Sequence, residues 1–188
     1  MKKSIVIVFL IMVGTGLTIF HAIRVGAYPV AVVDQHMITA HHFEEASASV
    51  NRYYDQMLKT YRETDPSLQD KSISLPEVRR ATLDKLIENV FIGAEYDAVV
   101  GENVEPLVTE KVTAAEKENP QFSQAVETLY GLTIERFKEV ILKSQAKEEM
   151  LKEKKADFTD WLVAKRKNAK VYILVSDLQW DGEKVINK

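Results

Sequence analysis

The sequence predicts a mainly α-helical protein of five or six helices with a small antiparallel sheet, preceded by an N-terminal transmembrane helix. Most of the chain carries apolar residues at three- and four-residue spacing, which is typical of amphipathic helices. β-Branched runs occur near both ends of the chain, so we expect an N-terminal hairpin and a C-terminal strand to form the sheet. The first residues form a long uncharged run that predicts the membrane helix.

The uncharged run covers 4–23, between the pair Lys2 and Lys3 and the closing Arg24. Crossing the hydrocarbon core takes about 20 residues, whereas the apolar part of a cleaved signal is usually about 7–15. We therefore expect an uncleaved anchor, with a signal cleaved before Tyr28 as the alternative. The two lysines keep the short end in the cytoplasm and place the rest outside.

Charge and cysteine content exclude several classes of function. The chain has 25 basic and 28 acidic residues, a net charge of −3. Omitting 1–24, which holds three basic residues and no acid, leaves 22 against 28, a balance of −6. Such a domain repels phosphate backbones, so we expect no nucleic-acid partner. With no cysteine, a disulfide framework, a thiolate metal site and a cysteine nucleophile are excluded.

The first strands are expected at 29–33 and 36–38, joined by the turn Asp34-Gln35. A two-residue turn favours glycine at its second position, so Gln35 costs about 1 kcal/mol or forces a looser turn. Thr39 then caps a long helix that ends at 65–66.

The segment 74–101 is expected to be the central helix. Ser74 and Glu77 have capping-box spacing, Pro76 lies in the first turn, and Gly101 marks the end. The apolar stripe of this helix is wide enough to contact two other elements. Its members are Leu75, Val78, Leu83, Leu86, Ile87, Val90, Phe91, Ala94 and Ala98.

Three further helices follow, over 104–118, from an Asn119 cap to Gly131, and from a Thr133 cap through the charged stretch 147–155. The segment 157–162 is either a continuation of the last of these or a new helix. The strand expected at 170–175 needs a partner, and only the early hairpin offers an edge. We therefore expect the two ends of a domain 28–175 to meet, with 1–27 as anchor or signal and 176–188 as a tail.

No catalytic constellation is found. His36, His41 and His42 do not make a convincing metal site, because His41 and His42 are adjacent and so point about 100° apart on a helix. The chain has no Gly-x-Ser-x-Gly element and no glycine-rich phosphate loop. We expect no enzyme activity, no metal and no cofactor.

An aromatic set on two of the helices is the candidate peptide-binding site. One interpretation is core packing, and the other is a partly exposed apolar cradle for extended polypeptide, since tyrosine and methionine give adaptable contact area. The residues alone leave both open. The set comprises Tyr53, Tyr54, Met57, Tyr61, Phe122, Leu129 and Tyr130.

Four segments carry a resemblance to a known family. They are the strand–turn–helix start Val30–Phe43, the Leu-Asp-x-Leu-Ile segment Leu83–Phe91, the Gly-x-Thr-x-x-x-Phe-Lys segment Gly131–Lys138, and the closing Phe158–Val171. In order and spacing these segments resemble the N-terminal chaperone domain of SurA-like and PrsA-like extracytoplasmic foldases. Gln35 departs from the family, which has glycine in the hairpin, and no segment for the usual parvulin-type isomerase domain is found.

The resemblance implies a non-catalytic chaperone, without prolyl isomerase activity, that holds unfolded secreted or envelope polypeptides. It implies a single-pass protein of the bacterial cytoplasmic membrane with its C-terminal domain outside, or a secreted one if the signal is cleaved. The alternative is a scaffolding domain that binds one folded envelope partner through the same residues. The sequence leaves the oligomeric state open.

Overall fold

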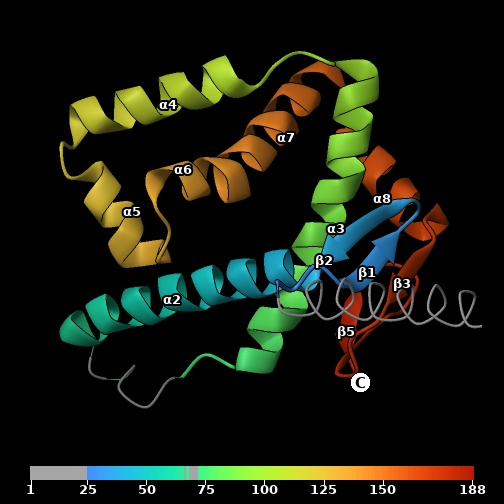
Figure 1. Ribbon diagram of the computed structural model, residues 1–188, viewed down its shortest axis with the longest axis horizontal. Coiled ribbons are helices and arrows are strands. Elements are labelled where there is room, and N and C mark those ends of the chain that lie inside the picture. Colours follow the sequence, from blue (N-terminus) through green and yellow to red (C-terminus); the bar gives the residue numbers. More distant parts are fainter. Residues whose placement is uncertain (1–24, 66, 68–71) are drawn as a thin grey trace, which may run out of the picture.

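The computed structural model describes residues 25–65, 67 and 72–188 (Figure 1). Within these residues the protein is mainly helical, with six helices when the continuous α6, η2 and α7 are counted as one, and two small antiparallel sheets. This confirms the mainly helical part of the expected fold class and its small antiparallel sheet. The expected transmembrane helix falls on 1–24, outside the described residues. No helix in the described part is long and apolar enough to cross a membrane.

The three-stranded sheet joins the two ends of the domain, as the sequence predicts. It contains β1 (Pro29–Val33), β2 (His36–Thr39) and β3 (Val171–Ile173), in the order β2-β1-β3 with both pairs antiparallel. The register places Val32 opposite Met37 on one side and opposite Tyr172 on the other.

The hairpin turn is tolerated for a reason that the sequence does not show. Asp34, rather than Gln35, takes the left-handed conformation, with φ of 53°, and aspartate accepts this better than most residues. Its amide donates to the Lys170 carbonyl at 2.8 Å, and its carboxylate accepts from Lys165 at 2.9 Å and from the Lys170 amide at 3.0 Å. These bonds lower the pKa of Asp34 and let the C-terminal segment support the turn.

Two 25-residue helices, α2 (Ala40–Thr64) and α3 (Leu75–Val99), follow the hairpin. Thr39 caps α2 as expected, accepting from the His42 amide at 3.4 Å. The expected capping box of α3 does not form: Ser74 makes no side-chain cap bond, and the Glu77 carboxylate pairs with Arg80 at 2.5 Å instead of reaching back to Ser74. Gly101, with φ of 65°, follows the end of α3 as expected.

The helix α3 is central, as expected, but it is buried on more sides than the predicted stripe. It packs against α2 on one side and α7 on another, and it also contacts β5. Ile92 and Tyr96 lie outside the stripe and are buried, because the C-terminal half of α3 packs against the residues of α4 and α7. Leu75, Ala94 and Ala98 belong to the stripe and are exposed.

The remaining helices are α4 (Glu105–Glu118), α5 (Phe122–Tyr130), α6 (Ile134–Phe137), the π-helical η2 (Lys138–Leu142), α7 (Lys143–Lys154) and α8 (Phe158–Asn168). Thr133 caps α6, accepting from the Arg136 amide at 3.3 Å. The helix expected from Asn119 begins later, because the Asn119 side chain accepts from the Gln121 amide in a turn at 3.0 Å. The segment after Asp157 is a new helix rather than a continuation.

The C-terminal segment 176–188, expected as a tail, forms a second hairpin. Its strands are β4 (Leu178–Trp180) and β5 (Val185–Asn187), paired antiparallel. Leu178 and Val185 are fully buried in the same hydrophobic cluster as the three-stranded sheet. Arg166 on α8 fastens this hairpin by donating to the Glu183 carbonyl at 2.7 Å and to the Asp84 carboxylate on α3 at 2.6 Å.

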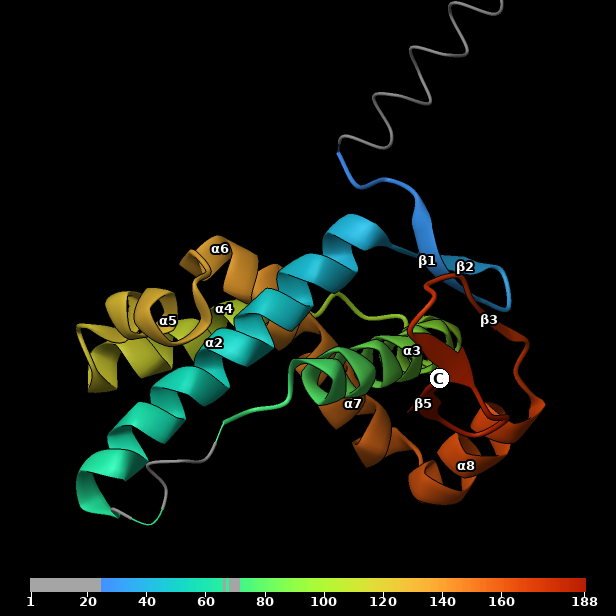
Figure 2. The ribbon, with the colours of Figure 1, turned by 90° about the horizontal axis from the view of Figure 1, so that it is seen from below.

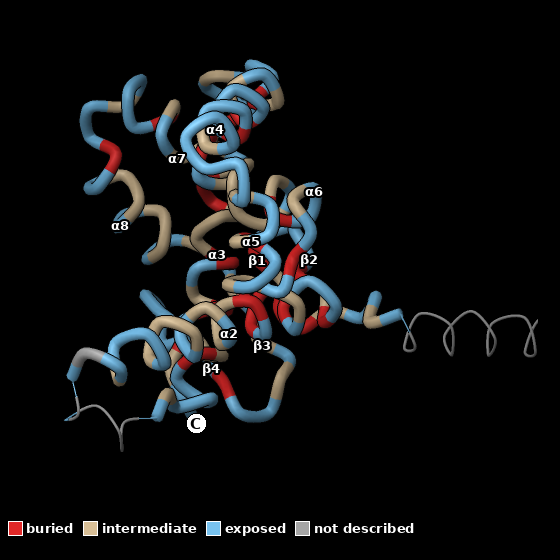
Figure 3. Tube along the Cα trace, turned by 90° about the vertical axis from the view of Figure 1, so that its left-hand side faces the viewer, coloured by how far each residue is buried: buried red, intermediate tan, exposed pale blue. Residues whose placement is uncertain are grey.

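The helices spread away from the sheets (Figures 1 and 2). The strands, α8 and the second hairpin gather at one end, while the distal part of α2, α4 and α5 form the other, and α3 and α7 lie between. Buried residues concentrate where the strands meet α2 and α3, whereas the distal part of α2 is mostly exposed or half-buried (Figure 3).

Candidate functional site

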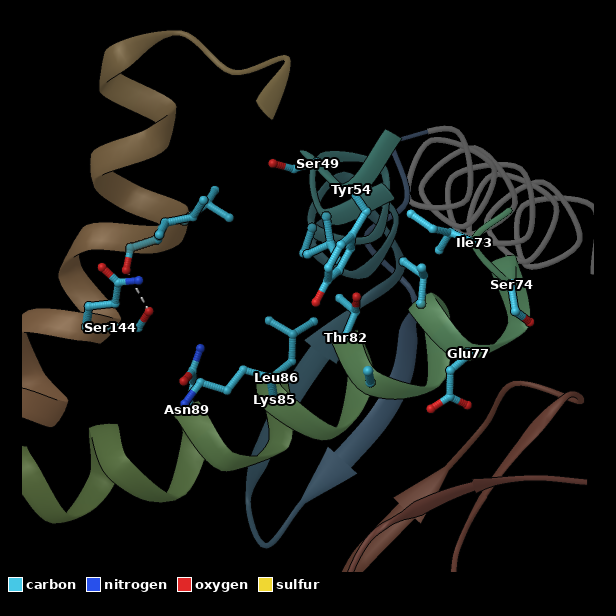
Figure 4. A pocket seen from close by; sticks show the side chains of 17 residues that line it. Ser49, Tyr54, Ile73, Ser74, Glu77, Thr82, Lys85, Leu86, Asn89 and Ser144 are labelled. Atoms are coloured by element: carbon cyan, nitrogen blue, oxygen red, sulfur yellow. Dashed lines mark hydrogen bonds between the residues drawn. The ribbon is translucent and has the colours of Figure 1, made fainter. Parts of the chain in front are cut away.

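A groove of about 570 Å³ lies between α2, α3 and the η2–α7 junction (Figure 4). This volume is within the roughly 300–1,000 Å³ that is usual for ligand pockets. Its walls are mainly apolar, and the segment that leads into α3 borders it. The apolar lining residues are Ala46, Val50 and Tyr54 of α2, Ile73, Val78, Ala81 and Leu86 on the α3 side, and Val140 and Ile141 of η2.

Helical spacing explains two walls and the π-helical turn contributes to the third. Ala46 and Val50 are four residues apart and so lie on one face of α2. Val78 and Ala81 repeat this on α3 with a spacing of three. Val140 and Ile141 belong to η2, and single π-helical turns inside α-helices are frequent at functional sites. The groove is thus assembled from three segments that are distant in the sequence.

Three polar side-chain atoms in this apolar groove have no hydrogen-bond partner. They are Ser49 Oγ, Thr82 Oγ1 and Asn89 Oδ1, and within the described residues only one other buried side-chain atom, Ser47 Oγ, shares this property. Figure 4 shows the three side chains around one cavity, with Tyr54 extending from α2 toward α3. Leaving a buried polar atom unpaired costs about 1–3 kcal/mol. The three atoms are themselves enclosed, so a ligand in the groove can bond them only after a rotation of their side chains.

Ion pairs join the helices that form the walls of the groove. Lys85 on α3 bonds Glu148 on α7 at 3.0 Å and Glu88 at 2.6 Å. Burial alone would lower the pKa of Lys85, but its hydrogen bonds with Glu88 and Glu148 outweigh burial and raise the pKa. On the α2 side, the Arg136 guanidinium donates to the Glu45 carboxylate and lowers the pKa of that carboxyl.

The predicted aromatic set divides between the groove and a neighbouring packing cluster. Tyr54 lines the groove and is 48% exposed. Tyr53 stacks on Tyr130 with ring centroids 5.1 Å apart, and Tyr130 contacts Phe137 at 5.0 Å. Burial raises the pKa of Tyr130. Tyr53 and Tyr130 thus pack α5 and α6 against α2, which is the core-packing interpretation.

The other members of the set do not line the groove. Phe122 meets the Phe137 ring edge-on at 6.3 Å, and Leu129 is half-buried on the same short helix. Met57 is half-buried and Tyr61 is 51% exposed, both further along α2. Of the seven predicted residues, the structure therefore brings only Tyr54 to the groove.

The residues that shape the groove most are small or polar, and the sequence does not single them out. Val50, Ala81 and Val140 are ordinary members of helical stripes. One signal was available: Thr82 and Asn89 are seven residues apart, so they share a face of the most buried helix, where unpaired polar groups are uncommon.

Metal chemistry finds no support among the residues that the structure describes, where no group of three or more histidine, aspartate or glutamate side chains could hold an ion. Comparison with protein-family models, with curated proteins and with solved structures finds no match for this chain. Among the structural features, the groove is therefore the best guide to function.

Proposed function

We propose that this protein is a membrane-anchored extracytoplasmic holdase that binds unfolded envelope polypeptides in the groove between α2, α3 and α7. The observation that carries this proposal is an open apolar groove whose lining residues Ser49, Thr82 and Asn89 each bury an unpartnered polar atom. The resemblance of the sequence to extracytoplasmic chaperone domains supports the same function. The groove needs no catalytic residue for it.

An unfolded polypeptide matches both properties of the groove. Its apolar side chains suit the walls, and its main chain offers an N–H donor and a C=O acceptor at nearly every residue. Once their side chains rotate toward the groove, the Ser49 and Thr82 hydroxyls can donate or accept, and Asn89 Oδ1 accepts. A purely apolar small molecule would leave these atoms unpaired, so a peptide main chain is the better ligand.

The size of the groove is consistent with weak, reversible binding. Burying two or three aliphatic side chains contributes about 1.5–3 kcal/mol each, or roughly 3–9 kcal/mol in all. Association itself costs an estimated 4 kcal/mol or more, which leaves an affinity in the weak range. A holdase that releases its client without nucleotide hydrolysis needs such an affinity.

The anchor forms part of the proposal. The uncharged run 4–23 tethers the domain to the bacterial cytoplasmic membrane, where secreted chains emerge unfolded. If the run is instead cleaved as a signal, the same domain acts in solution outside the membrane. The groove is the same in both cases.

Blocking the groove tests the function. Ala81 lines the groove from an exposed position on α3, so Ala81→Trp fills the space without entering the core. Ala98 is an exposed alanine on the same helix that does not line the groove, and Ala98→Trp is the matched control. We expect the parent chain and Ala98→Trp, in molar excess over the client and without ATP, to suppress light scattering by an unfolded client. Ala81→Trp should lose most of this suppression.

Two outcomes would contradict the proposal. A parent chain that leaves client aggregation unchanged would exclude a holdase. Equal suppression by both tryptophan variants, with unchanged melting temperatures, would place the binding face elsewhere. The scaffolding alternative predicts a third pattern, in which pull-down from membranes recovers one stoichiometric folded protein instead of many unrelated unfolded ones.

A further inference from the structure

The outer face of the three-stranded sheet is unusually apolar for a surface. Ten large apolar side chains are exposed in the described part of the chain, and five of them belong to the strands or the residues beside them. Three other exposed members of the ten lie on α2 or at the start of α3. The five are Val25, Tyr28, Met37, Tyr172 and Leu174.

The strand register places three of these side chains, those of Met37, Tyr172 and Leu174, on one face. Residues directly opposite each other in a sheet point to the same side. Met37, 54% exposed, and Tyr172, 62% exposed, flank Val32 in one row across all three strands. Leu174 is two residues beyond Tyr172, and its amide extends the ladder by donating to the Val30 carbonyl at 2.8 Å. On the other face of the sheet, the side chains of Ala31 and Ile38 are buried in the core.

The strands that carry this face have little acidic charge, although the chain beyond the first 24 residues is acidic overall. Asp34 is the only acid in 28–39 and 170–175, and it is paired with Lys165 at 2.9 Å. Lys170 and His36 are exposed at the strand ends. An apolar face that carries a tyrosine and no unpaired acid suits a lipid surface, because tyrosine is enriched at headgroup level.

The uncharged run 4–23 lies close in sequence to this sheet, which points to the lipid bilayer as the partner of the face. The run ends at Ile23, five residues before Tyr28. Five residues span at most about 18 Å, and each headgroup layer is roughly 5–7 Å thick. The sheet therefore lies within a short reach of the bilayer whenever the run is inserted. We propose that the face formed by Met37, Val32, Tyr172 and Leu174 rests in the headgroup region of the membrane and sets the orientation of the domain.

This inference rests on the anchor in the proposed function and not on holdase activity. A domain on a short linker swings freely unless a second contact holds it. A sheet face at the membrane supplies that contact, so the groove keeps one orientation relative to the lipid surface.

Because the chain has no cysteine, single-cysteine variants of the full protein report on one site each. We would attach a nitrobenzoxadiazole fluorophore to Met37→Cys and Tyr172→Cys, and to the controls Val99→Cys and Val163→Cys. The control sites are 52% and 49% exposed, at the end of α3 and on α8, outside the sheet. The proteins are reconstituted in phosphatidylcholine–phosphatidylglycerol vesicles with and without headgroup-nitroxide lipid, and flotation verifies insertion.

We expect the labels at 37 and 172 to be quenched at least twofold more than those at 99 and 163, at every protein-to-lipid ratio. The label at 37 should lose its excess quenching in a Tyr172→Asp, Leu174→Asp background. Equal quenching at all four sites would overturn the inference, as would a chain that fails to float. If the labels at 37 and 172 fluoresce as if buried but lose this signal when the protein is diluted with excess lipid, a second copy of the chain covers the face. That result also overturns the inference. Aggregation assays on the same variants report the holdase separately.

Discussion

Replacing Leu178 with alanine tests whether the C-terminal hairpin belongs to the core. Leu178 is 0% exposed and packs in the cluster formed by the three-stranded sheet, α2 and α3. The substitution removes three carbons, which at about 0.8 kcal/mol each amounts to roughly 2.4 kcal/mol of transfer free energy. The cavity left behind brings the expected loss to about 3–5 kcal/mol. Against a total of roughly 5–15 kcal/mol, this is a large fraction.

Thermal and urea unfolding, followed by circular dichroism on the full chain in detergent micelles, measure this loss. For a protein of this size, we expect the melting temperature to fall by about 6–20 °C. Leu75→Ala is the matched control, because Leu75 is 58% exposed, and it should change stability by no more than about 0.5 kcal/mol. Equal effects of the two substitutions would refute the burial of the hairpin.

Two further predictions concern the groove walls. Burial alone would raise the pKa of Glu148, but hydrogen bonds from Lys152 and Lys85 outweigh burial and lower the pKa. The contribution of Glu148 to the free energy of unfolding is therefore complete above its ordinary pKa of about 4.3, and it is lost as the pH falls through the lower folded value. We expect Glu148→Gln to reduce the loss of unfolding free energy at acid pH by about 0.5–1 kcal/mol. An unchanged pH dependence would contradict the ion pair between Lys85 on α3 and Glu148 on α7. Thr82→Val removes an unpaired buried hydroxyl, so chemical denaturation should show equal or greater stability, by up to about 1 kcal/mol, while client binding weakens. Clear destabilisation would mean that the hydroxyl has a partner in the free protein.

Capping residues and glycines in the sequence predicted the ends of several helices correctly. Thr39 and Thr133 cap helices, and Gly101 and Gly131 follow helix ends with positive φ, as their residue types indicate. The capping box expected from Ser74 and Glu77 does not form, and Glu77 pairs with Arg80 instead, a choice that depends on side-chain geometry. The second hairpin was missed although Asp181-Gly182 is a turn signal, because its strands have only three residues each.

The site was harder to predict than the fold, because the groove exists only after three distant segments pack. Tyr53 and Tyr130 attracted attention as aromatics, and the structure stacks them on each other between α2 and α5. Ala81 and Thr82 look like routine helix residues, and their role follows from the spacing of α2, α3 and η2. Small side chains leave a space only when the neighbouring helices do not close it.

Site-specific crosslinking tests the central claim, that the groove binds unfolded polypeptide, most directly. A benzophenone is attached to Ala81→Cys in the groove or to Ala98→Cys on the same helix outside it, in a chain that has no other cysteine. Each labelled protein is irradiated with an unfolded client and with the same client folded. The account predicts covalent adducts from position 81 with the unfolded client only, and few from position 98. Equal adducts from both positions, or adducts with the folded client alone, would contradict it.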